Sequence, residues 1–335
     1  DNNGITWTAL FEKENSFAIG VVEIDPSNPN VIWVGTGENN AQRSVGYGDG
    51  VYKSIDGGKT WKNMGLEDSG HISRIRFHPG DSNTVYVAAQ GPLWNSGGDR
   101  GLYRSTEGGA NWQRLLDIDE TTGINECVID PANPDMIGAS SYQRRRHVWT
   151  LINGGPGSGI HKSTDGGASW SKVAGGLPSG DLGRIGLASA PSEPNILYAI
   201  IEANDEDKGV YRSTDFGESW EKRSDHMTNS PQYYNELFVD PNDPERVYSV
   251  DTFTHVSTDG GENWEKISFK NRHVDDHALW IDPENSSHMY IGGDGGVYET
   301  WDQGNLWRHV RNLPVTQFYR STPDNDFPFY NVCAG

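Results

Sequence analysis

The sequence predicts an all-β fold, a seven-bladed β-propeller, and three observations carry that prediction. A short turn phrase recurs six times along the 335 residues, and the first residues look like a worn seventh copy. A second phrase, with two apolar runs joined by a turn rich in Pro, Asn and Asp, alternates with the first. The chain also has 41 Gly, 12 Trp and 14 Tyr, which is typical of many short strands joined by tight turns.

The turn phrase repeats at the spacing of one propeller blade. Its acidic residues lie 43 to 58 residues apart, and a blade of four short strands takes about 40 to 50 residues. The copies are KSIDGGKTW, RSTEGGANW, KSTDGGASW, RSTDFGESW, VSTDGGENW and ETWDQGNLW, ending at Trp61, Trp112, Trp170, Trp220, Trp264 and Trp307.

The chemistry of this phrase is local to its own turn. Glycine after the acidic residue supplies the positive φ that a tight hairpin needs. The carboxylate can accept backbone N–H groups of the same turn, and the tryptophan can fold back over it. A series of metal or ligand sites is the alternative, but hydrogen bonding within the turn already accounts for these residues. We therefore interpret the phrase as a hairpin staple that every blade needs.

The second phrase supplies the first two strands of each blade. An example is VEIDPSNPNVIWVG, in which a Pro/Asn/Asp turn separates two runs rich in Val and Ile. Each blade is therefore expected to read inner strand, second strand, third strand, turn phrase and outer strand. The copies begin at Val22, Arg76, Val128, Ala188, Phe238 and Trp280.

The two ends of the chain are expected to complete a seventh blade. Residues 316–326 and 329–335 read as its first two strands, and residues 6–11, TWTALF, read as its outer strand. Pairing these N- and C-terminal strands in one blade would remove the open sheet edges and close the ring. We expect one propeller domain over residues 1–335, and we expect the native polypeptide to continue, with a second propeller as one alternative.

Composition and charge limit the partners. The formal net charge of −20 gives no general support for a basic face that binds nucleic acid or an anionic membrane. No run approaches about 18 consecutive apolar residues, so no membrane-spanning helix is expected. Phosphate-binding loops, dinucleotide fingerprints and Cys-x-x-Cys pairs are absent from the sequence, and no cofactor is expected.

The S-x-D-G-G-x-x-W phrases resemble Asp-box (BNR) repeats over the whole chain. Their alternation with D-P-x-N-P turns resembles sortilin-type propellers and bacterial glycosyl-hydrolase-like proteins, more distantly the two-propeller xyloglucanases and the sialidases. This resemblance implies an exported protein, extracellular, periplasmic or at the cell surface. It also implies a polysaccharide or peptide ligand. In the two-propeller relatives the cleft lies between propellers, and each propeller supplies an acid.

Three long connections are expected on the face opposite the turn phrases: residues 35–52, 89–103 and 140–162. Binding residues are common in such loops. Their aromatic rings suit stacking on sugars, and their amides and arginines suit hydroxyl or carboxylate groups. The alternative is that the loops pack on one another and the arginines tie them down. The candidate ligand-binding residues are Asn39, Asn40, Gln42, Arg43, Gln90, Trp94, Tyr142, Gln143, Arg144, Arg145 and Arg146.

Glycoside hydrolysis needs two carboxyl groups, and Glu236 and Asp275 are the catalytic candidates. Glu236 follows two tyrosines and begins an expected inner strand near the central channel. Partial desolvation there is expected to raise its pKa, as a proton donor requires.

An alternating segment, RHVDDHALW, offers weak metal candidates. In an extended strand, His273, Asp275 and His277 would point the same way, as ligands of a divalent metal or as a hydrogen-bonded cluster. A hydrogen-bonded cluster is favoured, so no metal is assigned from sequence.

Three functions remain open at this stage. The first is a glycan-directed hydrolase-like propeller, acting alone or as half of a larger enzyme. The second is a non-catalytic module that binds a peptide or glycan on the looped face. The third is a structural part of a larger surface protein.

Overall fold

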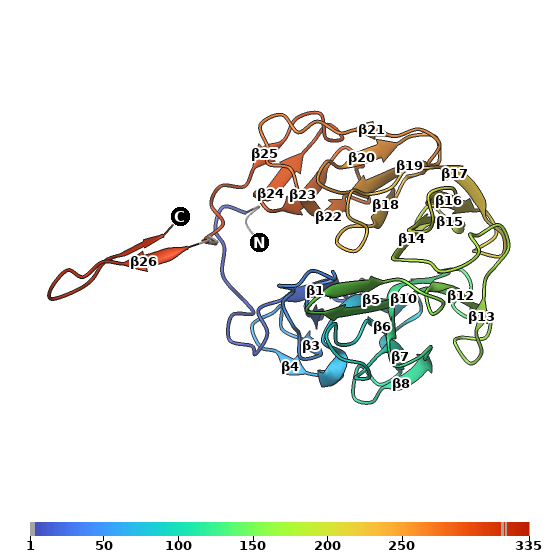
Figure 1. Ribbon diagram of the computed structural model, residues 1–335, viewed down its shortest axis with the longest axis horizontal. Helices are drawn as coiled ribbons and strands as arrows, with labels where there is room; N and C mark the ends of the chain where they lie inside the picture. Colours follow the sequence, from blue (N-terminus) through green and yellow to red (C-terminus); the bar gives the residue numbers. More distant parts are fainter. Residues whose placement is uncertain (1–3, 316–317, 319, 335) are drawn as a thin grey trace.

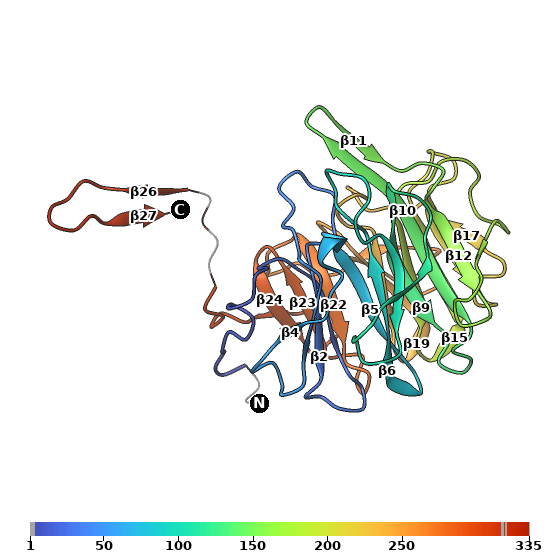
Figure 2. The ribbon, with the colours of Figure 1, turned by 90° about the horizontal axis from the view of Figure 1, so that it is seen from below.

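The computed structural model describes residues 4–315, 318 and 320–334, and within them the chain forms seven antiparallel sheets. Six sheets are blades that follow one another around a common centre, with the first strand of each innermost (Figure 1). The seventh is a two-stranded hairpin at the C-terminal end that projects away from the blades (Figure 2). The all-β prediction is confirmed.

The strands of the blades follow in chain order. Blades 1 and 2 hold β1 (Ile19–Ile24), β2 (Ile32–Thr36), β3 (Val51–Ser54) and β4 (Lys62–Asn63), then β5 (Ile72–His78), β6 (Asp81–Ala89), β7 (Gly101–Ser105) and β8 (Gln113–Leu116). Blade 3 holds β9 (Thr122–Ile129), β10 (Ile137–His147), β11 (Thr150–Asn153), β12 (Gly159–Ser163) and β13 (Ser171–Lys172). Blades 4 and 5 hold β14 (Ile185–Ala190), β15 (Glu193–Ile201), β16 (Gly209–Ser213) and β17 (Glu221–Ser224), then β18 (Glu236–Asp240), β19 (Asp243–Val250), β20 (His255–Ser257) and β21 (Glu265–Lys266). Blade 6 holds β22 (Asp276–Ile281), β23 (Met289–Gly293), β24 (Gly296–Thr300) and β25 (Arg308–His309), and the hairpin holds β26 (Ser321–Pro323) and β27 (Val332–Ala334).

Each blade is an antiparallel meander, which separates two kinds of connection onto two faces. The turns between first and second strands and the Asp-box turns lie on one face, and all other connections lie on the opposite, looped face. In blade 3 the second strand continues into the long hairpin β10–β11, which extends beyond the other loops (Figure 2). The short 3₁₀ helix η1 (Glu67–Ser69) joins blades 1 and 2. No described helix is long and apolar enough to cross a lipid bilayer.

Hydrogen bonds within the Asp-box turns confirm their local role. In blade 4 the Ser213 hydroxyl donates to Asp215 at 2.7 Å and accepts the Gly217 N–H at 2.8 Å. The Asp215 carboxylate in turn accepts the Ser219 N–H at 2.9 Å. Trp220 folds back and donates to the Gly217 carbonyl at 3.2 Å. The tryptophans at 61, 112 and 307 donate instead to carbonyls outside their own turns.

The hydrophobic core lies between the blades as five separate clusters, one for each pair of consecutive blades. A large residue at one position of the second strand faces the next blade and is buried: Trp33, Tyr86, Tyr198 and Tyr248 are at most 2% exposed. The matching residue of blade 6, Tyr290, is only half-buried, and its cross-strand partner Trp280 is 48% exposed. Within the part of the chain that the structure describes, this face of blade 6 is therefore not covered by another blade.

Closure of a seventh blade is not confirmed. Residues 6–11 hold no strand, and Phe11 packs edge-on against Tyr52 and Trp61 of blade 1. Strands β26 and β27 pair with each other, as expected of two consecutive strands, but among the described residues they pair with no blade. Near the two ends of the described chain, the Asn312 side chain donates to the carbonyls of Gly4 and Ile5 at 2.7 and 2.9 Å.

Candidate functional site

A buried network of charges fills the centre of the ring on the looped side. It comes from the starts of the inner strands of blades 2 to 5. Arg74 of β5 lies 2.6 Å from Glu126 of β9 and 2.7 Å from Glu236 of β18. Arg184, just before β14, contacts the other oxygen of Glu236 at 3.0 Å. Both carboxylates are therefore paired with arginines from other blades of the ring.

Amide side chains extend this network across the ring. Asn39, from the long connection of blade 1, donates to Glu236 at 2.9 Å. Gln90 donates to the side-chain oxygens of Asn39 and Asn125 at 2.5 and 2.6 Å. Asn235 adopts a left-handed φ of 68° and donates to the Arg184 carbonyl at 2.8 Å, so a buried asparagine holds the backbone next to Glu236. The network links blades 1 to 5.

The ionisation of the two glutamates differs from the sequence expectation. Burial alone would raise the pKa of Glu236, but Arg74 and Arg184 outweigh it, so this pKa lies below its usual value. The expectation of a raised pKa for Glu236 is therefore wrong. Burial does raise the pKa of Glu126, and the attraction of Arg74 only partly offsets it. Glu236 is thus an ionised carboxylate rather than a proton donor.

Asp275, the second catalytic candidate, lies beside the centre at the entrance of blade 6. Its backbone takes a left-handed φ of 76°, held by an N–H bond to the Thr252 carbonyl at 2.9 Å. Tyr234 donates its hydroxyl to the Asp275 carboxylate. The ring of His277 stacks on Tyr234, with centroids 5.5 Å apart.

The metal-candidate segment differs from the predicted alternation in one ligand. Because Asp275 interrupts the extended backbone, His273 turns away and its ring contacts the Val274 carbonyl. Asp294, in the β23–β24 turn, takes its place: one ligand atom each of Asp275, His277 and Asp294 lies within 4.8 Å of the others. The expectation that His273 points the same way as Asp275 and His277 is therefore wrong.

The three long connections pack on one another, which was the alternative to a ligand role. Arg144 donates to the Asn40 carbonyl at 2.6 Å, and Arg146 to the Ala41 carbonyl at 2.7 Å. Arg145 donates to the Ser96 hydroxyl at 2.9 Å. Backbone carbonyls and a hydroxyl, rather than carboxylates, are thus the partners of these arginines. Arg144 and Arg146 are buried, so they tie loops down and are not presented to a ligand.

The remaining ligand candidates divide by exposure. Tyr142 is 1% exposed and donates to Asn153, so it offers no face for stacking on a sugar. Gln90 is also buried. Trp94 is half-buried beside the apolar cluster of Ala41, Val45 and Leu93. Ligand binding stays a prediction for the candidates that solvent reaches: Asn39, Asn40, Gln42, Arg43, Trp94, Gln143 and Arg145.

A polar pocket of about 380 Å³ lies next to the charge network on the looped face. Its polar side chains are Asn153, Asp181, Glu202 and Asn204. Burial raises the pKa of Glu202, whose oxygens accept from Asn153 at 2.7 Å and from the Arg184 N–H at 3.0 Å. The pocket thus shares Arg184 with the centre, and its lining suits a polar ligand.

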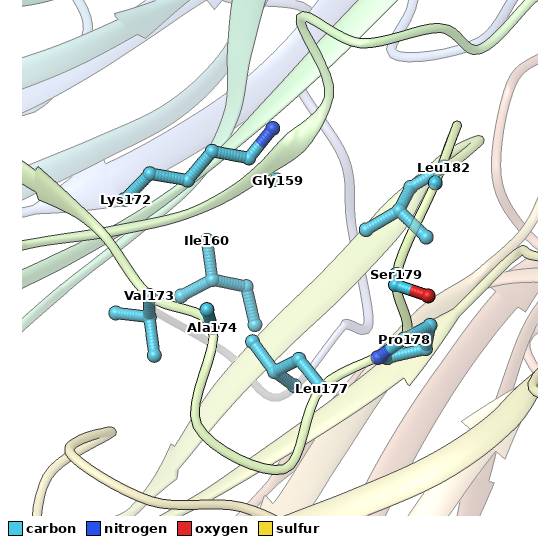
Figure 3. Close-up of a pocket in the computed structure, with 10 residues that line it drawn as sticks. Gly159, Ile160, Lys172, Val173, Ala174, Leu177, Pro178, Ser179 and Leu182 are labelled. Carbon is cyan, nitrogen blue, oxygen red and sulfur yellow. The ribbon is translucent and has the colours of Figure 1, made fainter.

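A second pocket, of about 200 Å³, is apolar (Figure 3). Ile160, Val173, Leu177 and Leu182 line it between blades 3 and 4. Its one charged neighbour, Lys172, is bound to the carbonyls of Pro156 and Ser158. We therefore assign the chemistry to the polar centre rather than to this pocket.

Sequence reasoning did not single out Asn125 and Asn235, although a signal was present. Each precedes the central glutamate of its blade, so the dipeptide Asn-Glu occurs at the same blade position in Asn125–Glu126 and Asn235–Glu236. A repeated polar pair at the start of an otherwise apolar inner strand indicates a role in the centre of the ring.

Comparisons with known proteins agree with this fold. Residues 211–222 and 255–266 match the BNR/Asp-box repeat. A xyloglucanase from Paenibacillus sp is 28% identical over 207 residues, 55% of this chain and 19% of that protein. A probable oligoxyloglucan-reducing end-specific xyloglucanase from Neosartorya fischeri is 34% identical over 97 residues, 28% of this chain and 10% of that protein. The chain thus spans about a fifth or less of these relatives.

Solved structures show the same architecture. The GH74 xyloglucanase from Xanthomonas campestris superposes with a TM-score of 0.64 at 16% identity, covering 96% of this chain and 52% of that one. YCF48 bound to D1 peptide superposes with a TM-score of 0.56 at 16% identity, covering 92% of this chain and 86% of that one. The chain is an Asp-box repeat propeller that resembles glycoside-hydrolase-like proteins.

Proposed function

We propose that this chain is an exported, glycan-directed and glycoside-hydrolase-like propeller that binds polysaccharide on its looped face. The similarity to xyloglucanases carries the proposal, together with the polar pocket at Glu202. A volume of about 380 Å³ lies within the usual range of small-molecule sites, and amides with carboxylates suit sugar hydroxyls. Export, to the cell surface, periplasm or medium, follows from the same similarity.

The ligand in this proposal lies across the rim of the looped face rather than through the ring. Side chains of Arg74, Glu126, Glu236 and Arg184 occupy the centre. One strongly exposed aromatic on this face is Trp149, at the tip of β10–β11, which is 81% exposed and stacks on His147. Trp149 and the Glu202 pocket both belong to the sector of blades 3 and 4.

Binding is tested by affinity electrophoresis of the purified chain in gels that contain xyloglucan, mixed-linkage glucan or no polysaccharide. Trp149→Ala removes a stacking face and is expected to weaken binding about 5- to 10-fold, the equivalent of about 1 kcal/mol. Val148→Ala, at the neighbouring exposed position, is the matched control and should migrate like the wild type. Equal mobility in every gel would contradict glycan binding.

For hydrolysis, Glu236 and Asp275 stay the proposed carboxylate pair, with Glu236 as the ionised member. The test is chromatography of oligosaccharides released from the same polysaccharides, with Glu236→Gln and Asp275→Asn beside the wild type. Loss of release in one variant identifies a catalytic carboxylate. Binding without release from any polysaccharide assigns the chain to glycan recognition alone.

Peptide binding is the second candidate, because the YCF48 structure with a similar fold contains a bound peptide. A peptide ligand predicts no retardation by polysaccharide and saturable binding of peptides from a library displayed on phage. Displacement of a bound peptide by xyloglucan from the wild type, but not from Trp149→Ala, would favour the glycan as the ligand.

A further inference from the structure

Three ligand-type side chains converge at the entrance of blade 6, next to the charge network of the centre. His277 of β22 directs its Nε2 atom at Asp294 Oδ1, 3.1 Å away, and at Asp275 Oδ1, 3.7 Å away. The backbone fixes this arrangement, since the Asp294 N–H donates to the Asp275 carbonyl at 3.1 Å. Two carboxylates from separate segments therefore face one imidazole nitrogen.

The imidazole nitrogen serves only one of the two carboxylates, while Asp275 Oδ1 accepts the hydroxyl of Tyr234. One ring N–H donates one good hydrogen bond, and the 3.1 Å contact to Asp294 uses it. Asp275 at 3.7 Å then lies beyond hydrogen-bond distance of that nitrogen. Among the described residues, neither carboxylate forms an ion pair with a lysine or arginine. A cation between the three atoms would serve both carboxylates and the nitrogen together.

His288 provides an internal comparison with the same residue types. It also has two carboxylate neighbours, Asp282 at 3.0 Å and Glu299 at 3.1 Å. However, Asp282 contacts Nδ1 and Glu299 contacts Nε2, on opposite sides of the ring. Each ring nitrogen there has one partner, and no point lies close to all three groups. His277 differs from His288 because both of its carboxylate neighbours face the same ring nitrogen, Nε2.

The two separations from the imidazole nitrogen fit a bound metal ion, and all three ligand atoms lie within 4.8 Å of one another. Ligand atoms at about 2.0–2.2 Å from a tetrahedral zinc lie about 3.3–3.5 Å from one another. The two measured contacts of His277 Nε2 bracket that value. Imidazole with carboxylates suits a transition metal such as Zn²⁺ or Mn²⁺, whereas Ca²⁺ takes 6–8 oxygen ligands. The three side chains are 31–54% exposed, which gives an ion and its water ligands access.

We infer that Asp275, His277 and Asp294 form a binding site for one divalent transition-metal ion, with coordination positions left open to solvent. The site shares Asp275 with the carboxylate pair proposed for hydrolysis. Replacement of Asp294 tests the metal site separately from hydrolysis, because Asp294 does not belong to the proposed catalytic pair. The inference does not depend on the glycan proposal, since ion binding is measured without any polysaccharide.

The test is isothermal titration of the untagged, chelator-treated chain with ZnCl₂ near pH 7. One saturable site is expected, and Asp294→Asn and Asp275→Asn should each weaken it at least about 10-fold. Asp282→Asn, which removes one carboxylate beside His288, is the matched control and should bind zinc like the wild type. Cobalt(II) absorption provides a second readout, since a site of low coordination number gives intense visible bands.

Three results would overturn the inference. One is the absence of a saturable site in the wild-type titration. Another is unchanged zinc affinity in both Asp294→Asn and Asp275→Asn, which would place the ion elsewhere. The third is an equal loss of affinity in Asp282→Asn. Circular dichroism of each variant confirms its fold, and the exposed position of Asp294 keeps that variant informative if Asp275→Asn unfolds.

Discussion

Glu126 has a raised pKa because burial in the centre of the ring outweighs the attraction of Arg74. A pKa of about 7 in the folded chain, above the usual 4.5, means that the folded state binds this proton more tightly than the unfolded state. The stability that Glu126 contributes is therefore fully present below about pH 4.5 and is lost as the pH rises through about 7. We expect a loss of roughly 1–3 kcal/mol between pH 5 and 8 from this residue.

The measurement is urea unfolding at pH 5, 6, 7 and 8 for the wild type and for Glu126→Gln. Buried histidines act in the opposite direction, since burial lowers the pKa of His161 to about 4 and disfavours folding in acid. The difference between the two pH profiles therefore isolates Glu126. Parallel profiles would contradict the assignment.

Arg74 is the residue on which both central glutamates depend. Its replacement by methionine leaves Glu126 and Glu236, with side chains 3% and 15% exposed, without this partner. Breaking a buried ion pair on one side typically costs about 3–5 kcal/mol. We expect Arg74→Met to destabilise the chain by that amount, and the double variant with Glu126→Gln to recover part of it, measured as a double-mutant cycle. Additive effects would show that the two residues are not coupled.

Residue positions in the centre were only partly predictable from sequence. Glu236 was placed near the channel because it begins an inner strand, and the structure places it there. Its ionisation was predicted in the wrong direction because Arg74 is 162 residues away along the chain. The sequence favours Tyr142 as a stacking surface, but the residue is buried. Its burial depends on the packing of three separate connections, and no local sequence pattern indicates that packing.

Asp-box turns determine stability at the scale of one blade. Ser213 is 2% exposed and accepts the N–H groups of Asp215 and Gly217. Ser213→Ala leaves a buried N–H without its acceptor, which costs about 1–3 kcal/mol. Thermal unfolding should show a lower Tm, whereas Ser179→Ala at an exposed loop position should change it little. An equal Tm for both variants would contradict the staple interpretation.

The hairpins of single blades are more predictable from sequence than individual side-chain contacts or the closure of the ring. The turn phrase specifies its hairpin through contacts within about four residues, so the sequence contains the whole interaction. The β10–β11 extension was only recognised as a long connection. No local sequence pattern in residues 140–162 distinguishes a paired β-ribbon from an irregular loop. The ribbon forms by cross-strand pairing, in which Arg144 lies opposite Asn153.

Among the described residues, blade 6 has a face that no other blade covers. Trp33, Tyr86, Tyr198 and Tyr248 are buried by the next blade, whereas Tyr290 is half-buried. The closed propeller over residues 1–335 therefore stays a prediction. Its seventh blade would hold β26, β27 and residues 6–11. Closure depends on pairing between distant segments, which local patterns suggest but do not specify.

We expect the C-terminal hairpin to cover this face in solution. Removal of residues 313–335 should then lower the Tm and increase acrylamide quenching of tryptophan fluorescence, because Trp280 and Trp301, 48% and 61% exposed in the structure, would lose the cover that closure gives them. When Trp280→Phe is introduced into both the full chain and the truncated chain, the difference in quenching between the two should become smaller. An unchanged Tm and unchanged quenching after truncation would contradict closure by this segment.

The connection of residues 35–52 joins blade 1 to a blade formed much later in the chain. The Ala41 N–H binds the Gln232 carbonyl, and Asn39 binds Glu236, 197 residues downstream. At about 5–20 residues per second, a ribosome needs roughly 10–40 s to supply that partner. During synthesis, this connection can therefore form its contacts with Gln90, Arg144 and Arg146 first. Its contacts with blade 5 form only after residue 236 has been made, so the link between blades 1 and 5 is a late step of ring assembly.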